Sequence, residues 1–166
     1  MWCPAGTTAA DPPQLLRDLV AWTRAPACVV SVYGSDYALA RGLAPTGCWW
    51  EAWLNPEAAA TMLTEVPDDV DDLRVWSRSP QFAAAVLDKR AALDAGVPID
   101  ARGALAWARS AGFGQGVDPA AVEAVLRSRE AFAERLVPAL LDALGFPAPV
   151  PAREEASLRG HAVISG

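Results

Sequence analysis

Catalysis by a histidine base has one candidate residue in this chain. The single histidine, His161, lies near the C-terminus and outside every segment with a helix or strand pattern. A catalytic triad or relay needs a base, a group that orients it and a nucleophile that converge in space. The sequence therefore predicts no histidine-dependent catalysis, and we assign no catalytic residue.

The residues that bind soft metals are also scattered. Cys3, Cys28 and Cys48 lie far apart, and the chain has none of the close cysteine or histidine pairs that are typical of a zinc site. An odd number of cysteines in a chain of this length favours free thiols over a disulfide framework. We therefore expect three free thiols, no metal site and no cofactor.

A run of carboxylates is the clearest charge feature. Between Glu51 and Asp72 the sequence has seven acids and no lysine or arginine. The stretch closes with Asp68, Asp69, Asp71 and Asp72. Clustered carboxylates suit Ca²⁺, but this run lacks the glycine turn and the distal glutamate of a calcium-binding loop. We predict a solvated helix start whose charge attracts a basic partner.

Tryptophan is frequent, with seven in 166 residues, and three of them lie in the segment 48–54. This segment is predicted to be a strand, along which side chains alternate between two faces. One face carries Trp49, Glu51 and Trp53, and the other carries Cys48, Trp50, Ala52 and Leu54. We expect Trp50 and Leu54 to face the core. Trp49 and Trp53 lie either under a helix or at a protein interface, where tryptophan is favoured.

A second hypothesis places a ligand pocket between this strand and the helices. The lining would consist of Tyr33, Asp36, Tyr37, Cys48, Trp50 and Glu51. A carboxylate held against tryptophans can have a raised pKa and act as an acid or a base. Glu51 is therefore the carboxylate on which such a function would depend.

The helices that position these residues are marked by a cap residue followed by proline. Proline at the first helical position lacks only an amide that would be unpaired anyway. Such pairs occur at Asp11-Pro12, Asn55-Pro56, Ser79-Pro80 and Asp118-Pro119. Predicted helices span about 12–24, 56–66, 69–78, 80–95 and 101–111, with a stop at Gly96 and a cap at Asp100. A long helix begins at Pro119, and Pro138 should kink or break it.

Two segments have strand patterns. Residues 28–33 are β-branched and aromatic, and residues 48–54 alternate as described. We expect the two strands to pair with each other. The predicted fold class is therefore mainly α (α+β), a helical domain with a small two-stranded β element near the N-terminus.

Length and composition favour one domain. We predict a flexible N-terminus over residues 1–10, a single globular domain over 11–145 and an extended proline-rich C-terminal tail over 146–166. Neither a secretory signal nor an apolar stretch of membrane-spanning length is evident, so we expect a cytoplasmic protein that does not bind membranes. Lys89 is the only lysine among 14 basic residues, a bias typical of a GC-rich, bacterial-like genome.

The net charge is −6, and it excludes one class of partner. A protein that binds nucleic acid directly presents a basic patch or stripe. The acids of this chain are instead concentrated in the stretch from Glu51 to Asp72. We therefore predict no direct contact with nucleic acid.

Three helical signals follow one another in the sequence. They are Ser79-Pro80-Gln81-Phe82, the alanine-rich run that ends in Ala111-Gly112-Phe113, and Asp118-Pro119-Ala120-Ala121-Val122. Over about residues 79–125 this order resembles a small helical family named for nitrogen fixation. Related domains serve as leader regions of ribosomally made, enzymatically modified peptides. The resemblance implies a docking domain recognised by other proteins. The region after these helices has no cysteine, so it does not look like a cross-linked product peptide.

Three functional hypotheses follow. The leading one is a non-enzymatic accessory or regulatory protein that binds another protein with a basic patch. Its aromatic-acidic contact surface would consist of Trp49, Trp53, Asp68, Asp69, Asp71 and Asp72. The alternatives are a small-molecule binder or enzyme with a pocket near Glu51, and an acidic mimic of nucleic acid. The sequence leaves the oligomeric state open.

Overall fold

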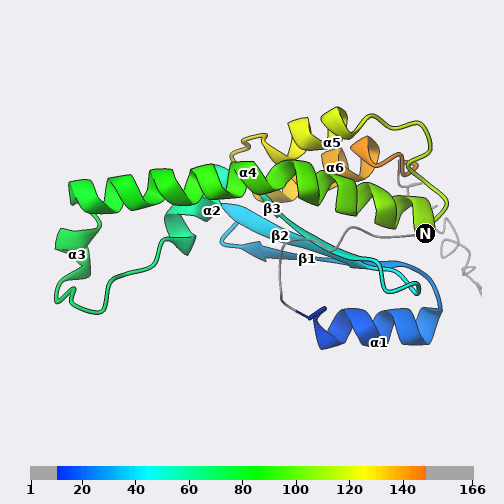
Figure 1. The fold of residues 1–166 in the computed structure, drawn as a ribbon, viewed down its shortest axis with the longest axis horizontal. Helices are drawn as coiled ribbons and strands as arrows, with labels where there is room; N and C mark the ends of the chain where they lie inside the picture. The colour runs from blue at the N-terminus through cyan, green and yellow to red at the C-terminus, as the bar shows by residue number, and fades with distance from the viewer. Residues whose placement is uncertain (1–10, 149–166) are drawn as a thin grey trace, which may run out of the picture.

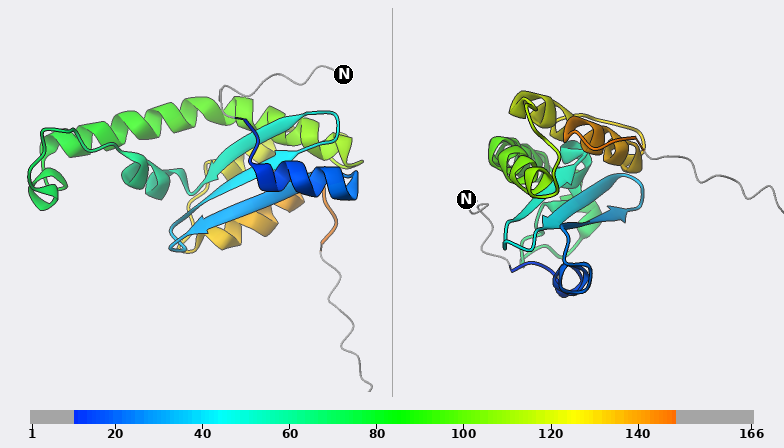
Figure 2. Two further views of the ribbon diagram at one scale, coloured as in Figure 1. Left: turned by 90° about the horizontal axis from the view of Figure 1, so that it is seen from below. Right: turned by 90° about the vertical axis from the view of Figure 1, so that its right-hand side faces the viewer.

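A computed structural model describes residues 11–148 of the chain, in which helices cover both faces of an antiparallel sheet (Figure 1). The helices are α1 (Gln14–Thr23), α2 (Pro56–Leu63), α3 (Leu73–Trp76), α4 (Pro80–Ser110), α5 (Pro119–Leu126) and α6 (Leu136–Ala143), preceded by the 3₁₀ turn η1 (Ala133–Arg135). The strands are β1 (Ala27–Tyr33), β2 (Tyr37–Leu43) and β3 (Trp49–Leu54). Helix α1 lies on one face of the sheet, and α4, α5 and α6 lie on the other (Figures 1 and 2).

The predicted two-stranded element is wrong, because the sheet has three strands in the order β1-β2-β3. The two predicted strands do not pair with each other, since both pair with β2. Strand β2 places Ala38, Ala40 and Gly42 on the face toward α4. A methyl group on Gly42 would collide with the Trp50 indole, so close packing requires small residues here. These residues have low strand propensity, which hides β2 in the sequence.

The 31-residue helix α4 corrects a second prediction. Gly96 does not end a helix, and Asp100 lies inside α4 instead of capping a new one. Pro98 also lies inside the helix, although proline removes an interior hydrogen bond. The helix continues because Val97 and Ala101, on either side of Pro98, are both buried in the core between the sheet and α4.

The predicted helix over 69–78 is shorter in the structure, and only Leu73–Trp76 is helical. The carboxylate of Asp72 caps it by accepting a hydrogen bond from the amide of Arg74 at 2.8 Å. The caps predicted at Ser79 and Asp118 are confirmed: each side chain accepts a hydrogen bond from a free amide at its helix start. The caps predicted at Asp11 and Asn55 are wrong, although helices follow both: Pro13 precedes α1, and the Asn55 side chain makes no cap hydrogen bond to α2.

The long helix predicted from Pro119 is broken before Pro138, which lies near the start of α6. The break covers residues 127–132, and tertiary hydrogen bonds account for it. The amide of Ala133 donates to the carbonyl of Ser35 at 2.8 Å. The side-chain amide of Asn55 donates to the carbonyl of Glu130 at 3.0 Å. These contacts draw the connection toward the β1–β2 turn and away from helical geometry.

The main core lies between the sheet and helices α4, α5 and α6. Its aromatic part begins with Trp50 on β3, whose ring centroid lies 5.8 Å from that of Trp107 on α4. Phe146 continues the stack at 5.4 Å from Trp107 and 4.4 Å from Phe113. Phe146 therefore packs on this core at the start of the predicted tail. The predicted N-terminal segment, His161 and most of that tail lie outside the described residues.

One part of the chain extends beyond the sheet (Figure 1). It consists of the end of α2, the connection 64–72, α3 and the first turns of α4, and we call residues 62–88 the arm. At its tip the rings of Trp76 and Phe82 meet edge to face, with centroids 6.0 Å apart. This contact holds α3 against the start of α4.

Candidate functional site

The alternation predicted for residues 48–54 is confirmed in β3. Trp50, Ala52 and Leu54 are buried in the core, while Trp49, Glu51 and Trp53 are half-buried on the opposite face. One strand therefore sends its tryptophans to two different environments.

Among residues 11–148, helix α1 covers one end of the face that carries Trp49 and Trp53. There, Leu16 and Val20 of α1 pack against Leu43 and Trp49. Seen from this side, α1 crosses one end of the sheet and leaves the other end open (Figure 2, left). Trp49 thus lies beneath a helix.

Trp53 lies in a different cluster, together with both tyrosines of the chain. Tyr33 and Tyr37 stack across the β1–β2 turn with ring centroids 4.9 Å apart. The Trp53 ring lies 6.2 Å from Tyr33 and 5.8 Å from Tyr37. The structure therefore brings together one residue of the predicted contact surface and two of the predicted pocket.

The six residues of the predicted pocket occupy both faces of the sheet. Tyr33, Tyr37 and Glu51 share the face of α1. Cys48 and Trp50 are buried in the core on the other side. Asp36 lies in the turn between β1 and β2, where its carbonyl accepts a hydrogen bond from Asn55. These residues do not line one shared pocket.

The described cysteines are not reactive thiols. Cys48 is disulfide-bonded, so the expectation of three free thiols is wrong for this residue. Cys28 is free, and burial raises the pKa of its thiol to about 11. Since the thiolate is the nucleophilic form, Cys28 is protonated and inert at neutral pH.

Glu51 forms an ion pair across the sheet. Its Oε2 atom lies 3.3 Å from Nε of Arg41, its partner in the β2–β3 register. Asp100 on α4 has a carboxyl group with a strongly raised pKa. Burial, and then the negative charge of Glu51, raises the pKa of Asp100 to about 7.

Asp100 was predicted to cap a helix, and a site at this residue was therefore not predicted from the sequence. Its spacing from buried Val97 and Ala104 places it on the inner side of α4, and that spacing is a usable signal. A carboxyl group that titrates near neutral pH can transfer protons. However, the cavity beside Asp100, which Trp53 and Val97 also line, has a volume of about 10 Å³. It can hold about one water molecule and no substrate.

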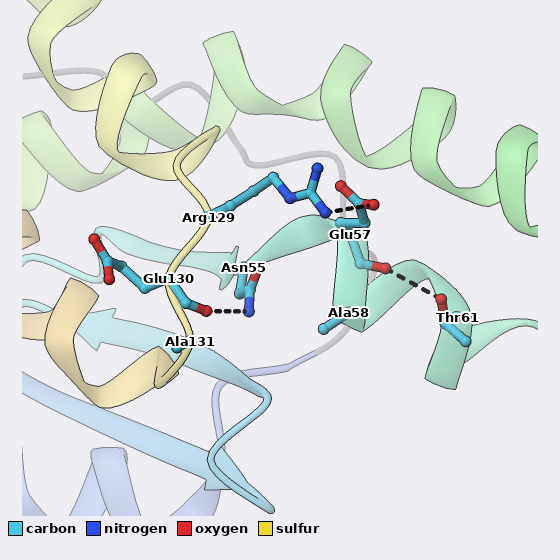
Figure 3. A pocket seen from close by; sticks show the side chains of 7 residues that line it. All are labelled: Asn55, Glu57, Ala58, Thr61, Arg129, Glu130 and Ala131. Carbon is cyan, nitrogen blue, oxygen red and sulfur yellow. Dashed lines mark hydrogen bonds and ion pairs between the residues drawn. The ribbon is translucent and has the colours of Figure 1, made fainter.

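A larger pocket opens where α2 meets the connection before η1 (Figure 3). Its volume is about 410 Å³, and its polar lining residues are Asn55, Glu57, Thr61, Arg129 and Glu130. Glu57 lies 2.7 Å from Arg129 and 3.4 Å from Arg90, so one carboxylate faces two guanidinium groups. The side-chain amide of Asn55 donates hydrogen bonds to the carbonyls of Asp36 and Glu130. These polar groups tie the connection to α2 and to the β1–β2 turn.

The four predicted aspartates lie on the arm, and all are exposed. Asp72 caps α3, while Asp68, Asp69 and Asp71 precede it in the connection from α2. The same arm exposes large apolar side chains between 45% and 68%: Met62, Val66, Leu73, Val75 and Leu87. These apolar residues were not predicted as contact residues from the sequence. The acid run therefore lies on the same arm as these exposed apolar side chains, and not on the face of Trp49 and Trp53.

Comparisons with known protein families, with characterised proteins and with solved structures find no match for this chain. Within residues 11–148, no cluster of three or more His, Cys, Asp or Glu side chains could hold a metal ion. No helix in the same range is both long and apolar enough to cross a membrane.

Proposed function

We propose that this chain is a non-enzymatic accessory or regulatory protein that binds another protein through its arm. One observation carries the proposal: the arm exposes Met62, Val66, Leu73, Val75 and Leu87 beside a run of carboxylates. Single exposed apolar residues are ordinary on protein surfaces, whereas several on one projecting element indicate an interaction site.

The charge of the arm defines the partner. Asp68, Asp69 and Asp71 are exposed next to α3, and the sequence from Glu51 to Asp72 has no basic residue. A partner with a basic rim around an apolar contact would complement this surface. Such charges steer association and fix orientation, while apolar contacts supply most of the affinity.

The arm is preorganised for such a contact. The Asp72 cap fixes the start of α3, and the ring contact between Trp76 and Phe82 fixes α3 against α4. Leu73 and Val75 are therefore exposed on an ordered turn. Less conformational entropy is lost on binding when the contact residues are already in place.

The experiment compares two surfaces of the same protein. The wild-type protein, a Leu73→Ser/Val75→Ser variant and a Trp22→Ser control would each be used to capture partners from lysate of the source cells, with quantitative mass spectrometry. Trp22 is 82% exposed on α1 and belongs to a different surface. We expect a specific protein with a basic patch to bind wild type and control, and to lose most of its binding to the arm variant.

Circular dichroism would establish that both variants fold like the wild type. If the captured protein binds the arm variant as well as it binds the wild type, the arm is not the contact surface. If only the Trp22→Ser variant loses binding to the captured protein, the contact surface lies on α1 instead.

A further inference from the structure

Strand β1 is an unusual edge strand. Within residues 11–148 it pairs with β2 on one side and has no strand on the other. Edge strands normally carry charges, prolines or bulges, because bare backbone amides and carbonyls recruit further strands. Residues 27–33 of β1 include neither a charged residue nor a proline.

We infer that β1 pairs antiparallel with β1 of a second copy of this chain, so that two sheets join into one of six strands. This surface is separate from the arm, and the inference does not depend on the proposed function.

The residue sizes along β1 fit a two-fold arrangement. Pairing centred on Val30 places Cys28 opposite Val32 of the second copy and Ala27 opposite Tyr33. Each small side chain then faces a larger one, and paired residues share a face of the joined sheet. No like charges meet along the strand, although each chain carries a net charge of −6.

The charges at the two ends of β1 favour the antiparallel direction. Arg24 precedes the strand and Asp36 follows it, and both are exposed. Antiparallel pairing brings the Arg24 end of one copy beside the Asp36 end of the other. Parallel pairing would bring like charges together, which costs energy at an interface.

Exposed apolar side chains lie at the end of the same strand. Val32 is 44% exposed and Tyr33 is 39% exposed. Phe132 is 46% exposed, and the bond from Ala133 to Ser35 holds it near this end of the sheet. A second copy along β1 would cover apolar surface there, which favours association.

Sedimentation equilibrium over a range of concentrations tests the inference with a matched pair of substitutions. Val32→Lys puts an ammonium group into the proposed interface, while Val66→Lys places the same group on the arm at 45% exposure. We expect a wild-type dimer and an unchanged dimer for Val66→Lys. Val32→Lys should raise the dissociation constant about tenfold or more, because the ammonium groups lose water on pairing.

A cysteine substitution tests the register. In the two-fold arrangement the Cα atoms of residue 32 and Cys28 of the second copy lie about 5 Å apart, a separation that a disulfide can bridge. Val32→Cys should therefore form covalent dimers with oxidised glutathione as oxidant at alkaline pH, whereas Val66→Cys should form far fewer. A monomeric wild type, or a dimer that Val32→Lys leaves intact, would overturn the inference.

Discussion

The side-chain amide of Asn55 donates a hydrogen bond to the carbonyl of Glu130, which lies 75 residues later in the chain. It donates a second hydrogen bond to the carbonyl of Asp36. Asn55 is buried and adopts a positive φ of 58°, a conformation that asparagine tolerates better than most residues. One residue thus joins the end of β3, the β1–β2 turn and the connection before η1.

Two substitutions of Asn55 should separate the contribution of its hydrogen bonds to stability from that of its backbone conformation. Asn55→Gly keeps the positive φ but removes the donor to the carbonyls of Asp36 and Glu130, and should lower the free energy of unfolding by about 2 kcal/mol. Asn55→Ala adds backbone strain and should cost roughly 1 kcal/mol more. Urea unfolding of both variants measures the two terms. Equal stability of glycine and alanine variants would contradict a strained backbone at this position.

Asp100 should make stability depend on pH. Burial and the charge of Glu51 raise its pKa to about 7, whereas an aspartate in an unfolded chain has a pKa of about 4. Between these values the folded chain binds more protons than the unfolded chain. The contribution of Asp100 to the free energy of unfolding therefore falls as pH rises from about 4 to about 7 and is constant above that range.

Thermal unfolding at pH 5 and pH 8 tests this prediction. The amide of an asparagine side chain cannot ionise, so Asp100→Asn should raise Tm at pH 8 by more than at pH 5. Asp88→Asn, at an exposed position of the same helix, serves as the control and should change both values little. A Tm difference that is the same at both pH values would show that Asp100 does not carry a buried charge at pH 8.

Two glycine-to-alanine changes should act in opposite directions. At Gly42 a methyl group would collide with the Trp50 indole, and overpacking of this kind costs about 1–3 kcal/mol. At Gly96 the nearest atom is the Asp100 Oδ2 at 3.6 Å, an ordinary contact, and alanine stabilises a helix interior by about 1 kcal/mol. Urea midpoints should therefore fall for Gly42→Ala and rise for Gly96→Ala. A tolerated alanine at residue 42 would contradict the close approach of Trp50.

The same glycines mark where sequence reasoning succeeded and failed. The alternation of Trp49, Trp50 and Trp53 predicted β3 and its buried face, because that pattern depends only on strand geometry. Strand β2 was not predicted. Trp50 fills the core opposite β2, so β2 needs small residues there, and small residues have low strand propensity. Helix α4 was divided at Gly96 because local propensity ignores the burial of Val97 and Ala101.

The candidate site was predictable only in part, for the same reason. The acid run can be read directly from the sequence, so its four aspartates were predicted as contact residues. The exposure of Leu73 and Val75 is a tertiary property, because it depends on where α3 lies relative to α4. Asp100 acquires its raised pKa from burial and from Glu51, 49 residues earlier in the chain, and only the fold places these residues together.

The acid run should control how the arm binds its partner. A triple variant, Asp68→Asn/Asp69→Asn/Asp71→Asn, removes exposed charge and leaves Asp72 to cap α3. For a partner with a basic patch, we expect a weaker affinity at low salt, mainly through a slower association rate. High salt should reduce the difference between the variant and the wild type, because exposed charges are screened.

Association and dissociation rates at low and high salt check this prediction on the captured partner. Leu73→Ser/Val75→Ser provides the contrast, since loss of apolar contact should raise the dissociation rate at either salt concentration. The triple variant therefore reports the effect of charge on the association rate, and the double variant reports the effect of apolar contact on the dissociation rate. An affinity that is the same in the triple variant and the wild type at low salt would show that the aspartates lie outside the contact, even if the arm itself binds.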